Sequence, residues 1–489
     1  MLNRIRLENF KSIKFLDFQC TKLNLLAGLN GSGKSSFVQF LNFLRCYARK
    51  DFKPRLWCPY RDLGLPGGFK DVKYCYARED EQVRFHVDFA AKENFVWTEG
   101  EEQCGSIDRI IYLDDYEKDN VCVEDSDVYE RSLSLVKNGE LAEVDEHNKG
   151  LAYAPACDED IKFKQKEFWD YVKSVEGREK LIQSAYKSVW ENARFVDAFR
   201  RKPVDVHVGS GEYGSMKDAT RFDVSFDPEG VDAVEYLYKF GRIVRLDQAN
   251  PMIYPGSELH EVVVNSVEED LLFNKDPGAY FMDDPLKYEY EDGDIRRFST
   301  LLEQVDAWLS VVSPDAHLNI SREFAGDKEW FVAMVGFGEE GCEKMFRPQN
   351  VGFGISYVLP VLATVLTARP TDIIIIENPE AHLHPKGQSE MGKLLARAAA
   401  YGVQIFVETH SDHVINGIRV ATKQGILHPS DVNIAFFDRR KHKVRYADGI
   451  REEYYADIFN IKVDRNGALS NYPKGFLDEW NNQYYRLNR

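Results

Sequence analysis

The feature that most constrains this chain is Gly28–Ser35, which reads Gly-Leu-Asn-Gly-Ser-Gly-Lys-Ser. It fits the P-loop pattern G-x-x-x-x-G-K-[ST]. The apolar run Leu23–Leu26 before it is typical of a buried strand, and the apolar spacing from Phe37 to Leu44 is typical of a buried helix. A glycine-rich turn between strand and helix presents backbone N–H groups and a helix N-terminus to phosphates. The stretch therefore predicts a nucleoside triphosphate site.

Each position of this loop has an expected role. The Lys34 ammonium group would contact the β- and γ-phosphates, and the Ser35 hydroxyl would be a ligand of Mg²⁺. The loop glycines would let backbone N–H groups turn toward the phosphates. We expect ATP and Mg²⁺ to be held by the following residues: Asn30, Gly31, Ser32, Gly33, Lys34, Ser35 and Ser36.

Composition limits the class of protein. A chain of 489 residues is long for one hydrophobic core, so several substructures are expected. The net charge of −17 argues against a surface built mainly to wrap nucleic acid, although it leaves room for a local basic groove. The eight cysteines include no Cys-x-x-Cys pair, which favours reduced thiols. With no signal sequence or membrane-spanning run, we expect a cytoplasmic protein without a membrane partner.

The N-terminal sequence resembles that of RecF, SMC and OLD-type ATPases, a branch of the ABC superfamily. The similarity lies in "IRLENFKSIKFLDF" and "LNLLAGLNGSGKSS". It implies an α/β fold, a P-loop ATPase head of the ABC type with an antiparallel β subdomain and an α-rich insertion. The alternating segments of residues 51–150 agree with such an antiparallel sheet.

We divide the chain into four segments. Residues 1–156 are expected to form the N-terminal part of the head, and 157–300 an α-rich insertion with an acidic loop. Residues 301–450 would complete the head, and 451–489 would form a C-terminal tail. Local patterns predict a helix over Ile295–Val312, followed by strands near His317–Phe324 and Trp330–Phe337.

A second catalytic element is expected at Thr371–Glu377, where four isoleucines precede a carboxylate. A run apolar on both faces suits a central parallel strand, and ligands bind at the carboxyl ends of such strands. The string "IIIIENPEAHLHP" resembles the Walker B segment of OLD-like ATPases, which implies that Glu377 holds Mg²⁺. The second acid of that family's pair is Asn378 here, and an amide cannot accept a proton from water. Either Glu380 or another group substitutes as the base, or hydrolysis is slow.

Another buried strand is predicted at Val403–Thr409, followed by His410. The string "VETHSDHV" resembles the switch-histidine segment of these ATPases, which implies that His410 contacts the γ-phosphate. The pairs His382-x-His384 and His410-x-x-His413 could instead be read as a metal cluster. That alternative is disfavoured because no cysteine or acid completes a known zinc pattern.

A glycine-containing loop, Asn350–Ser356, precedes an apolar helix predicted over Tyr357–Ala368 with Pro360 near its first turn. By its position this loop resembles a divergent ABC signature motif. The resemblance implies that Gly354 and Ser356 complete the nucleotide site of an opposite subunit, so we expect a homodimer or a higher oligomer built through the heads.

The C-terminal part begins with a strand over Asp431–Phe437 and a basic turn over Asp438–Lys443. The string "NGALSNYPKGFLDEW" then resembles a domain of unknown function found in bacterial ATPases, many from anti-phage systems of the Septu kind. The resemblance implies a regulatory ATPase that controls a separate effector, with a nuclease favoured. A RecF-like DNA-repair ATPase is the alternative. An OLD-type nuclease is disfavoured because residues 411–489 contain no D-x-D cluster.

Overall fold

The computed structural model describes most of the chain in two compact units. The first unit comprises Met1–Thr21, Gly28–Ala193 and Phe436–Phe459, and the second comprises Lys22–Ala27, Arg194–Ala435 and Asn460–Arg489. The described residues are 1–49, 55–59, 73–78, 81–92, 102–113, 120–125, 133–137, 140–143, 189–190, 193–196, 207–208, 233–242, 244–264, 294–325, 328–338, 344–347, 350, 353–446 and 449–487.

The first unit is built around an eight-stranded antiparallel sheet, as the sequence predicts. Its main order is β2 (Ile13–Gln19), β1 (Leu2–Phe10), β5 (Val83–Lys92), β6 (Glu102–Leu113), β7 (Asn120–Asp125) and β4 (Arg55–Pro59). Strand β8 (Leu133–Lys137) also pairs with β6, and β9 (Glu140–Glu143) pairs with β8. Helix α1 (Lys34–Arg49) packs on this sheet through aromatic rings. The Phe37 ring lies 4.9 Å from Phe18, and the Phe40 ring lies 5.5 Å from Phe10. This packing fixes the helix that follows the P-loop.

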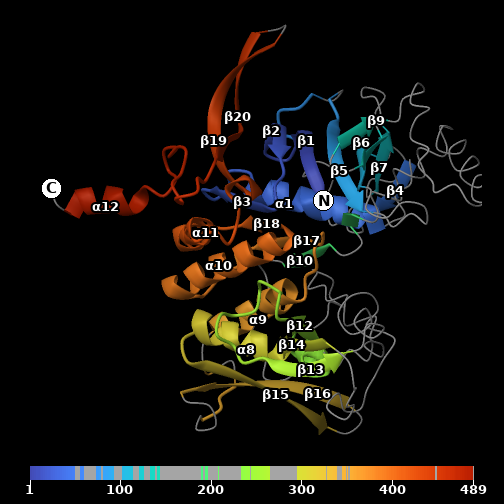
Figure 1. Ribbon diagram of the computed structural model, residues 1–489. Coiled ribbons are helices and arrows are strands. Elements are labelled where there is room, and N and C mark those ends of the chain that lie inside the picture. Colours follow the sequence, from blue (N-terminus) through green and yellow to red (C-terminus); the bar gives the residue numbers. More distant parts are fainter. Residues whose placement is uncertain are drawn as a thin grey trace, which may run out of the picture. The chain divides into compact units, whose positions relative to one another are not determined.

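The second unit contains the parallel sheet that the isoleucine-rich strand predicts. Four parallel strands lie in the order β10 (Arg194–Val196), β17 (Ile373–Glu377), β18 (Gln404–Glu408) and β3 (Leu23–Gly28). All four isoleucines of β17 are fully buried. Helices α9 (Phe353–Leu366), α10 (Pro385–Tyr401) and α11 (Asp412–Lys423) are interleaved with these strands along the chain. The α/β fold class is thereby confirmed. The strand order continues from β3 to β19 (Val432–Tyr446) and β20 (Gly449–Ile461), of which Phe436–Phe459 belong to the first unit (Figure 1).

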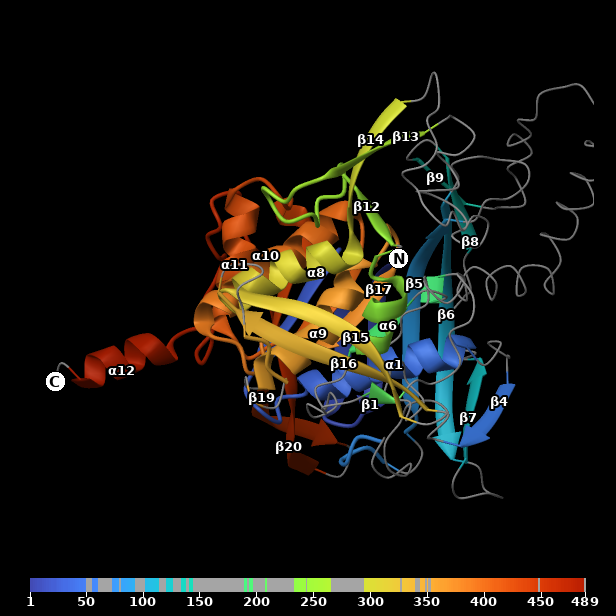
Figure 2. The ribbon, with the colours of Figure 1, turned by 90° about the horizontal axis from the view of Figure 1, so that it is seen from below.

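The rest of the second unit forms a smaller layered region. It contains α6 (Ala233–Phe240) and α8 (Leu301–Val312), with two three-stranded sheets. The strands are β11 (His207–Val208), β12 (Arg245–Asp247), β13 (His260–Val264), β14 (Asp294–Thr300), β15 (Ala316–Ala325) and β16 (Lys328–Phe337). Figure 2 shows α8 lying along β15 and β16. A short 3-10 helix (Pro429–Asp431) and the terminal helix α12 (Glu479–Leu487) complete the described elements.

Several local predictions need correction. The helix predicted from Ile295 starts only at Leu301, because Thr300 is its N-cap and forms a capping box with Glu303. Pro360 lies in the interior of α9, since that helix already begins at Phe353. The supposed basic turn Asp438–Lys443 is part of the continuous strand β19. Most of residues 157–300, including the acidic loop, lies outside the described residues, so the α-rich insertion stays a prediction.

Candidate functional site

The P-loop connects β3 to α1 and has the backbone conformation that its glycines allow. Gly28, Gly31 and Gly33 have φ angles of 141°, 74° and 113°. Residues with a Cβ rarely adopt these angles, which explains why glycine occupies all three positions. The strand and the helix predicted on either side of the loop are both present.

The basic and hydroxyl groups of the loop are arranged to receive an anion. Lys34 is only 2% exposed, and its Nζ donates hydrogen bonds to the carbonyl oxygens of Gly28 (2.8 Å) and Leu29 (2.9 Å). The Ser32 Oγ is buried and has no hydrogen-bond partner among the described residues. Buried polar atoms normally have partners, so this hydroxyl fits a ligand oxygen. Asn30, Gly31 and Ser35 are exposed at the same loop. These groups fit a phosphate chain with Mg²⁺ at Ser35.

The rear of the loop is closed by tight packing within the first unit. A Cβ on Gly28 would lie 2.3 Å from the carbonyl oxygen of Phe437, and one on Gly33 would lie 3.1 Å from the Ala456 Cβ. The Ser36 Oγ shares a hydrogen bond of 2.9 Å with the Ser12 Oγ. Ser36 is therefore held by the turn between β1 and β2, while the exposed loop residues are the ones accessible to a ligand. The sequence pattern gave no signal for the packing partners Phe437 and Ala456.

The second unit brings the other predicted residues to one edge of the parallel sheet. Glu377 at the end of β17 pairs in register with Glu408 at the end of β18, and Glu408 pairs with Leu26 of β3. The carboxyl ends of these three strands therefore share an edge, which is where ligands bind in such sheets. In the sequence, Leu26 is followed by Ala27 and then by the first P-loop residue.

The segment after Glu377 is held in a defined turn. Asn378 has a left-handed φ of 47°, a conformation that asparagine tolerates better than most residues. Its backbone N–H donates to the carbonyl oxygen of Glu408 at 2.8 Å. Glu377 and Asn378 are both partly exposed at the sheet edge, and the Oδ1 of Asn378 is buried.

Glu380 is placed differently from its two neighbours. It is 8% exposed, and its Oε1 accepts a hydrogen bond of 2.8 Å from the backbone N–H of His410. The carboxylate thus links the Walker B turn to the switch segment. This contact favours a positioning role for Glu380 over the role of general base.

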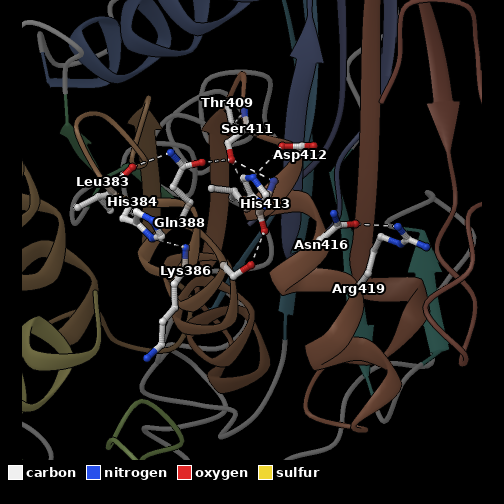
Figure 3. Close-up of polar contacts among 12 residues, drawn as sticks. Leu383, His384, Lys386, Gln388, Thr409, Ser411, Asp412, His413, Asn416 and Arg419 are labelled. Atoms are coloured by element: carbon white, nitrogen blue, oxygen red, sulfur yellow. Dashed lines mark hydrogen bonds and ion pairs between the residues drawn. The ribbon is translucent and has the colours of Figure 1, made fainter. Parts of the chain in front are cut away.

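The segment around His410 is anchored by its neighbours. The side chain of His410 is exposed, whereas Thr409 and Ser411 are buried. The Ser411 Oγ accepts hydrogen bonds from the N–H groups of His413 and Val414 (both 3.1 Å) and so caps α11. It also donates to Gln388 Oε1 at 2.5 Å (Figure 3). The His410 loop is therefore tied to α10.

The histidines do not support the alternative metal site. His384 caps α10, with its Nδ1 accepting from the Lys386 N–H at 3.4 Å (Figure 3). The ring of His382 packs edge-on against Tyr357. Among the described residues, which include all four histidines, no group of three or more His, Cys, Asp or Glu side chains could hold a metal ion.

The predicted signature residues lie in the first turn of α9. A Cβ on Gly354 would lie 2.8 Å from the carbonyl oxygen of His382, so the glycine permits a close backbone approach inside the second unit. Gly354 and Ser356 are partly exposed. Their predicted contact with a nucleotide of a second subunit stays a prediction.

Sequence patterns missed a buried ion pair beside the Walker B strand. Arg194 lies in β10, within the segment that we expect to form an α-rich insertion, and its Nη2 lies 3.4 Å from Asp372 Oδ2. The guanidinium group also donates to the carbonyl oxygens of Thr364 (3.0 Å) and Thr367 (3.1 Å). Burial raises the pKa of Asp372 above its ordinary value, against the opposing effect of Arg194. An arginine in a mixed-charge stretch carries no signal for such a role.

Two protein families match parts of the chain. Residues 255–416 match the family described as "AAA domain, putative AbiEii toxin, Type IV TA system". Residues 427–487 match a family described as a protein of unknown function, DUF3696, which agrees with the similarity predicted for the tail. No curated protein matches the sequence. The first match supports an ATPase.

Solved structures with similar folds include heads of SMC proteins. An SMC head bound to the C-winged helix domain of ScpA has 12% identity and a TM-score of 0.42, covering 95% of this chain and 98% of that one. The SMC head domain from Thermotoga maritima has 10% identity and a TM-score of 0.35, with coverages of 94% and 99%. An SMC head with an extended coiled coil, derived from Pyrococcus furiosus and bound to the C-terminal domain of ScpA, has 11% identity and a TM-score of 0.37, with coverages of 100% and 99%.

No helix within the described part of the chain is long and apolar enough to span a membrane.

Proposed function

We propose that this chain is the ATP-binding regulatory subunit of a cytoplasmic bacterial anti-phage complex, in which it controls a separate effector protein. A nuclease is the effector that we favour. Three observations support the proposal. The P-loop has groups suited to a triphosphate, and residues 255–416 match a family whose description names a toxin of a toxin–antitoxin system. The tail matches a family of unknown function and resembles the tail of ATPases from anti-phage systems.

One observation carries the regulatory part of the proposal. Asn378 follows the predicted Mg²⁺ ligand Glu377 at the place where related ATPases have a general base, and it is partly exposed at the sheet edge. Glu380, the acid expected to be the substitute, is buried and accepts a hydrogen bond from the His410 backbone. A site that binds ATP but lacks a positioned base holds its nucleotide for long periods, because proton transfer to a base contributes about 10²–10⁴-fold to such rates. Slow turnover suits a subunit that keeps an effector silent.

The nucleotide would also control assembly. Gly354 and Ser356, partly exposed at the start of α9, would bind the ATP held by a second copy, so that ATP joins two heads. Glu377 and Ser35 would hold the Mg²⁺, and the exposed His410 would respond to the γ-phosphate.

Purification of the tagged chain from its native host tests this function. We expect an effector to co-purify, and DNA cleavage by the complex to rise when an ATP-degrading enzyme removes the nucleotide. The Lys34→Ala variant should cleave without that treatment. Purification of the chain without any effector, or cleavage that does not respond to nucleotide, would contradict the regulatory role.

A further inference from the structure

Strands β19 and β20 form a two-stranded ribbon that extends beyond strands β1 and β2 of the same unit (Figure 1). Successive residues of a strand point to opposite faces. Four exposed cations therefore share one face of β19: Arg439, Lys441, Lys443 and Arg445. We call this surface the basic face.

The opposite face of the ribbon is used for anchoring. Glu453 is 1% exposed, and its Oε2 accepts hydrogen bonds from Lys14 Nζ (2.7 Å) and from the Tyr74 hydroxyl (3.3 Å). The Tyr446 hydroxyl also donates to Glu453, and the guanidinium group of Arg78 lies 4.8 Å from the Tyr446 ring centre. Since Tyr446 alternates with Arg445 along β19, these contacts lie opposite the basic face and leave it open.

The charge of the basic face contrasts with that of the whole protein. The chain has a net charge of −17, yet only Glu452 offers a carboxylate contact to these cations in the described part of the ribbon, at 2.6 Å from Lys441 Nζ. Lys443 interacts electrostatically with the same carboxylate, and Arg445 forms no ion pair with any residue that the structure describes. The Arg439 guanidinium group lies 5.9 Å from the ring centre of Tyr454, which is itself 41% exposed. Concentrated cations on an acidic protein indicate an anionic partner.

The dimensions of the basic face match a nucleic acid duplex. Residues on one face of a strand repeat every ~6.8 Å, so the four cations cover about 20 Å. A B-DNA duplex has one phosphate charge per ~1.7 Å of axis, so several phosphates lie within reach of such a row. A two-stranded ribbon also fits within the major groove, which is about 12 Å wide.

We propose that the basic face of the β19–β20 ribbon binds the phosphate backbone of duplex DNA. The extended row of cations follows a linear array of charges, which a duplex presents and a folded acidic protein surface rarely does. The contacts are to phosphates, so we expect little dependence on base sequence. This binding site is additional to the proposed regulatory function and does not depend on it.

Fluorescence anisotropy with a labelled DNA duplex of mixed sequence tests the proposal on the full chain. The test variant replaces all four cations of the basic face with glutamine. We expect its affinity to fall by about tenfold to a thousandfold near 0.1 M salt, and the slope of log K against log[salt] to decrease in magnitude by about 3 to 4. Replacing Lys441 and Lys443 with arginine should preserve both values.

A matched control neutralises four exposed cations of the second unit: Lys423, Lys462, Arg465 and Lys474. It changes the net charge equally and should leave affinity nearly unchanged, and thermal melting will show whether each variant is folded. Equal binding by the wild type and the basic-face variant would overturn the proposal, as would a wild type that binds no duplex at low salt. Loss of binding only to phosphatidylserine vesicles would assign the face to membranes instead, and a change only in oligomer mass would assign it to a second copy of the chain.

Discussion

Replacing Asn378 with glutamate should accelerate ATP hydrolysis if the missing base limits turnover. The residue follows Glu377 at the sheet edge and is partly exposed as a whole, but its Oδ1 is buried, so we expect the longer side chain of glutamate to be needed to bring a carboxylate to the attacking water molecule. A positioned base contributes about 10²–10⁴-fold, and we expect the wild type to turn over below about 1 s⁻¹. We therefore expect the Asn378→Glu variant to hydrolyse ATP at least ten times faster than the wild type.

The backbone at this position sets a cost for the change. The φ angle of 47° is tolerated by asparagine but disfavoured for glutamate, at about 1 kcal/mol. We therefore expect a slightly lower Tm in the variant together with faster turnover. Asn378→Asp should keep the stability, because aspartate also tolerates this conformation, and should gain less activity because its carboxylate is shorter by one methylene.

The matched control is Asn378→Gln, which has the shape and backbone cost of the glutamate variant without the acid. Phosphate release under saturating MgATP, measured with purified full-length chains, separates the two. Equal turnover of the Glu and Gln variants would refute the missing-base explanation. If Glu380→Gln also abolished wild-type turnover, Glu380 would be the base and a continuously cycling ATPase would be the better account.

The remaining predictions concern the metal, the assembly and the stability of each unit. Glu377→Gln should abolish turnover and weaken metal binding, and titration with Mn²⁺ as a paramagnetic probe would measure the metal affinity. Unchanged affinity would contradict the role of Glu377 as a metal ligand. Ser356→Arg should block ATP-dependent assembly, measured as mass by light scattering with and without ATP; an unchanged mass would disprove the signature assignment. Arg194→Met should cost about 3–5 kcal/mol in denaturant unfolding, because it leaves a buried carboxylate without its partner, and the added change Asp372→Leu should restore most of the loss. Burial opposes ionisation of Glu453, but hydrogen bonds from Lys14 and Tyr446 lower its pKa below the ordinary 4.5. The ionised Glu453 therefore stabilises the fold fully above about pH 4.5, and this contribution is lost as the pH falls through the lowered pKa of the folded state. Because Lys14→Met removes one cause of the lowered pKa, it should move the midpoint of acid unfolding to a higher pH.

The sequence was most informative where the chemistry or the burial required particular residues. The glycines of the P-loop follow from its positive φ angles, and the four isoleucines of β17 follow from a strand covered on both faces. Local requirements of this kind are visible as patterns in the sequence. Such patterns predicted the strand–loop–helix around the P-loop, the antiparallel sheet of the first unit and the parallel sheet of the second.

Features that depend on distant partners could not be predicted in this way. The role of Arg194 could not be predicted, because its pairing with Asp372 joins residues far apart in the chain. The contact of Gly354 with the His382 carbonyl has no local signature either. The basic run from Asp438 was read as a turn because strand β19 continues without the buried apolar residues that normally mark a strand.

Calorimetric titration of MgATP into the wild type and Lys34→Ala is the most direct test of the central claim that the P-loop binds ATP. Lys34 is buried in the loop and bonded to the Gly28 and Leu29 carbonyls, so removing its charge should abolish binding. An exposed lysine variant, Lys423→Ala, controls for loss of a positive charge, and circular dichroism will confirm that both variants fold. We predict saturable binding by the wild type and the control, and none by Lys34→Ala; equal affinity in all three would contradict the P-loop assignment.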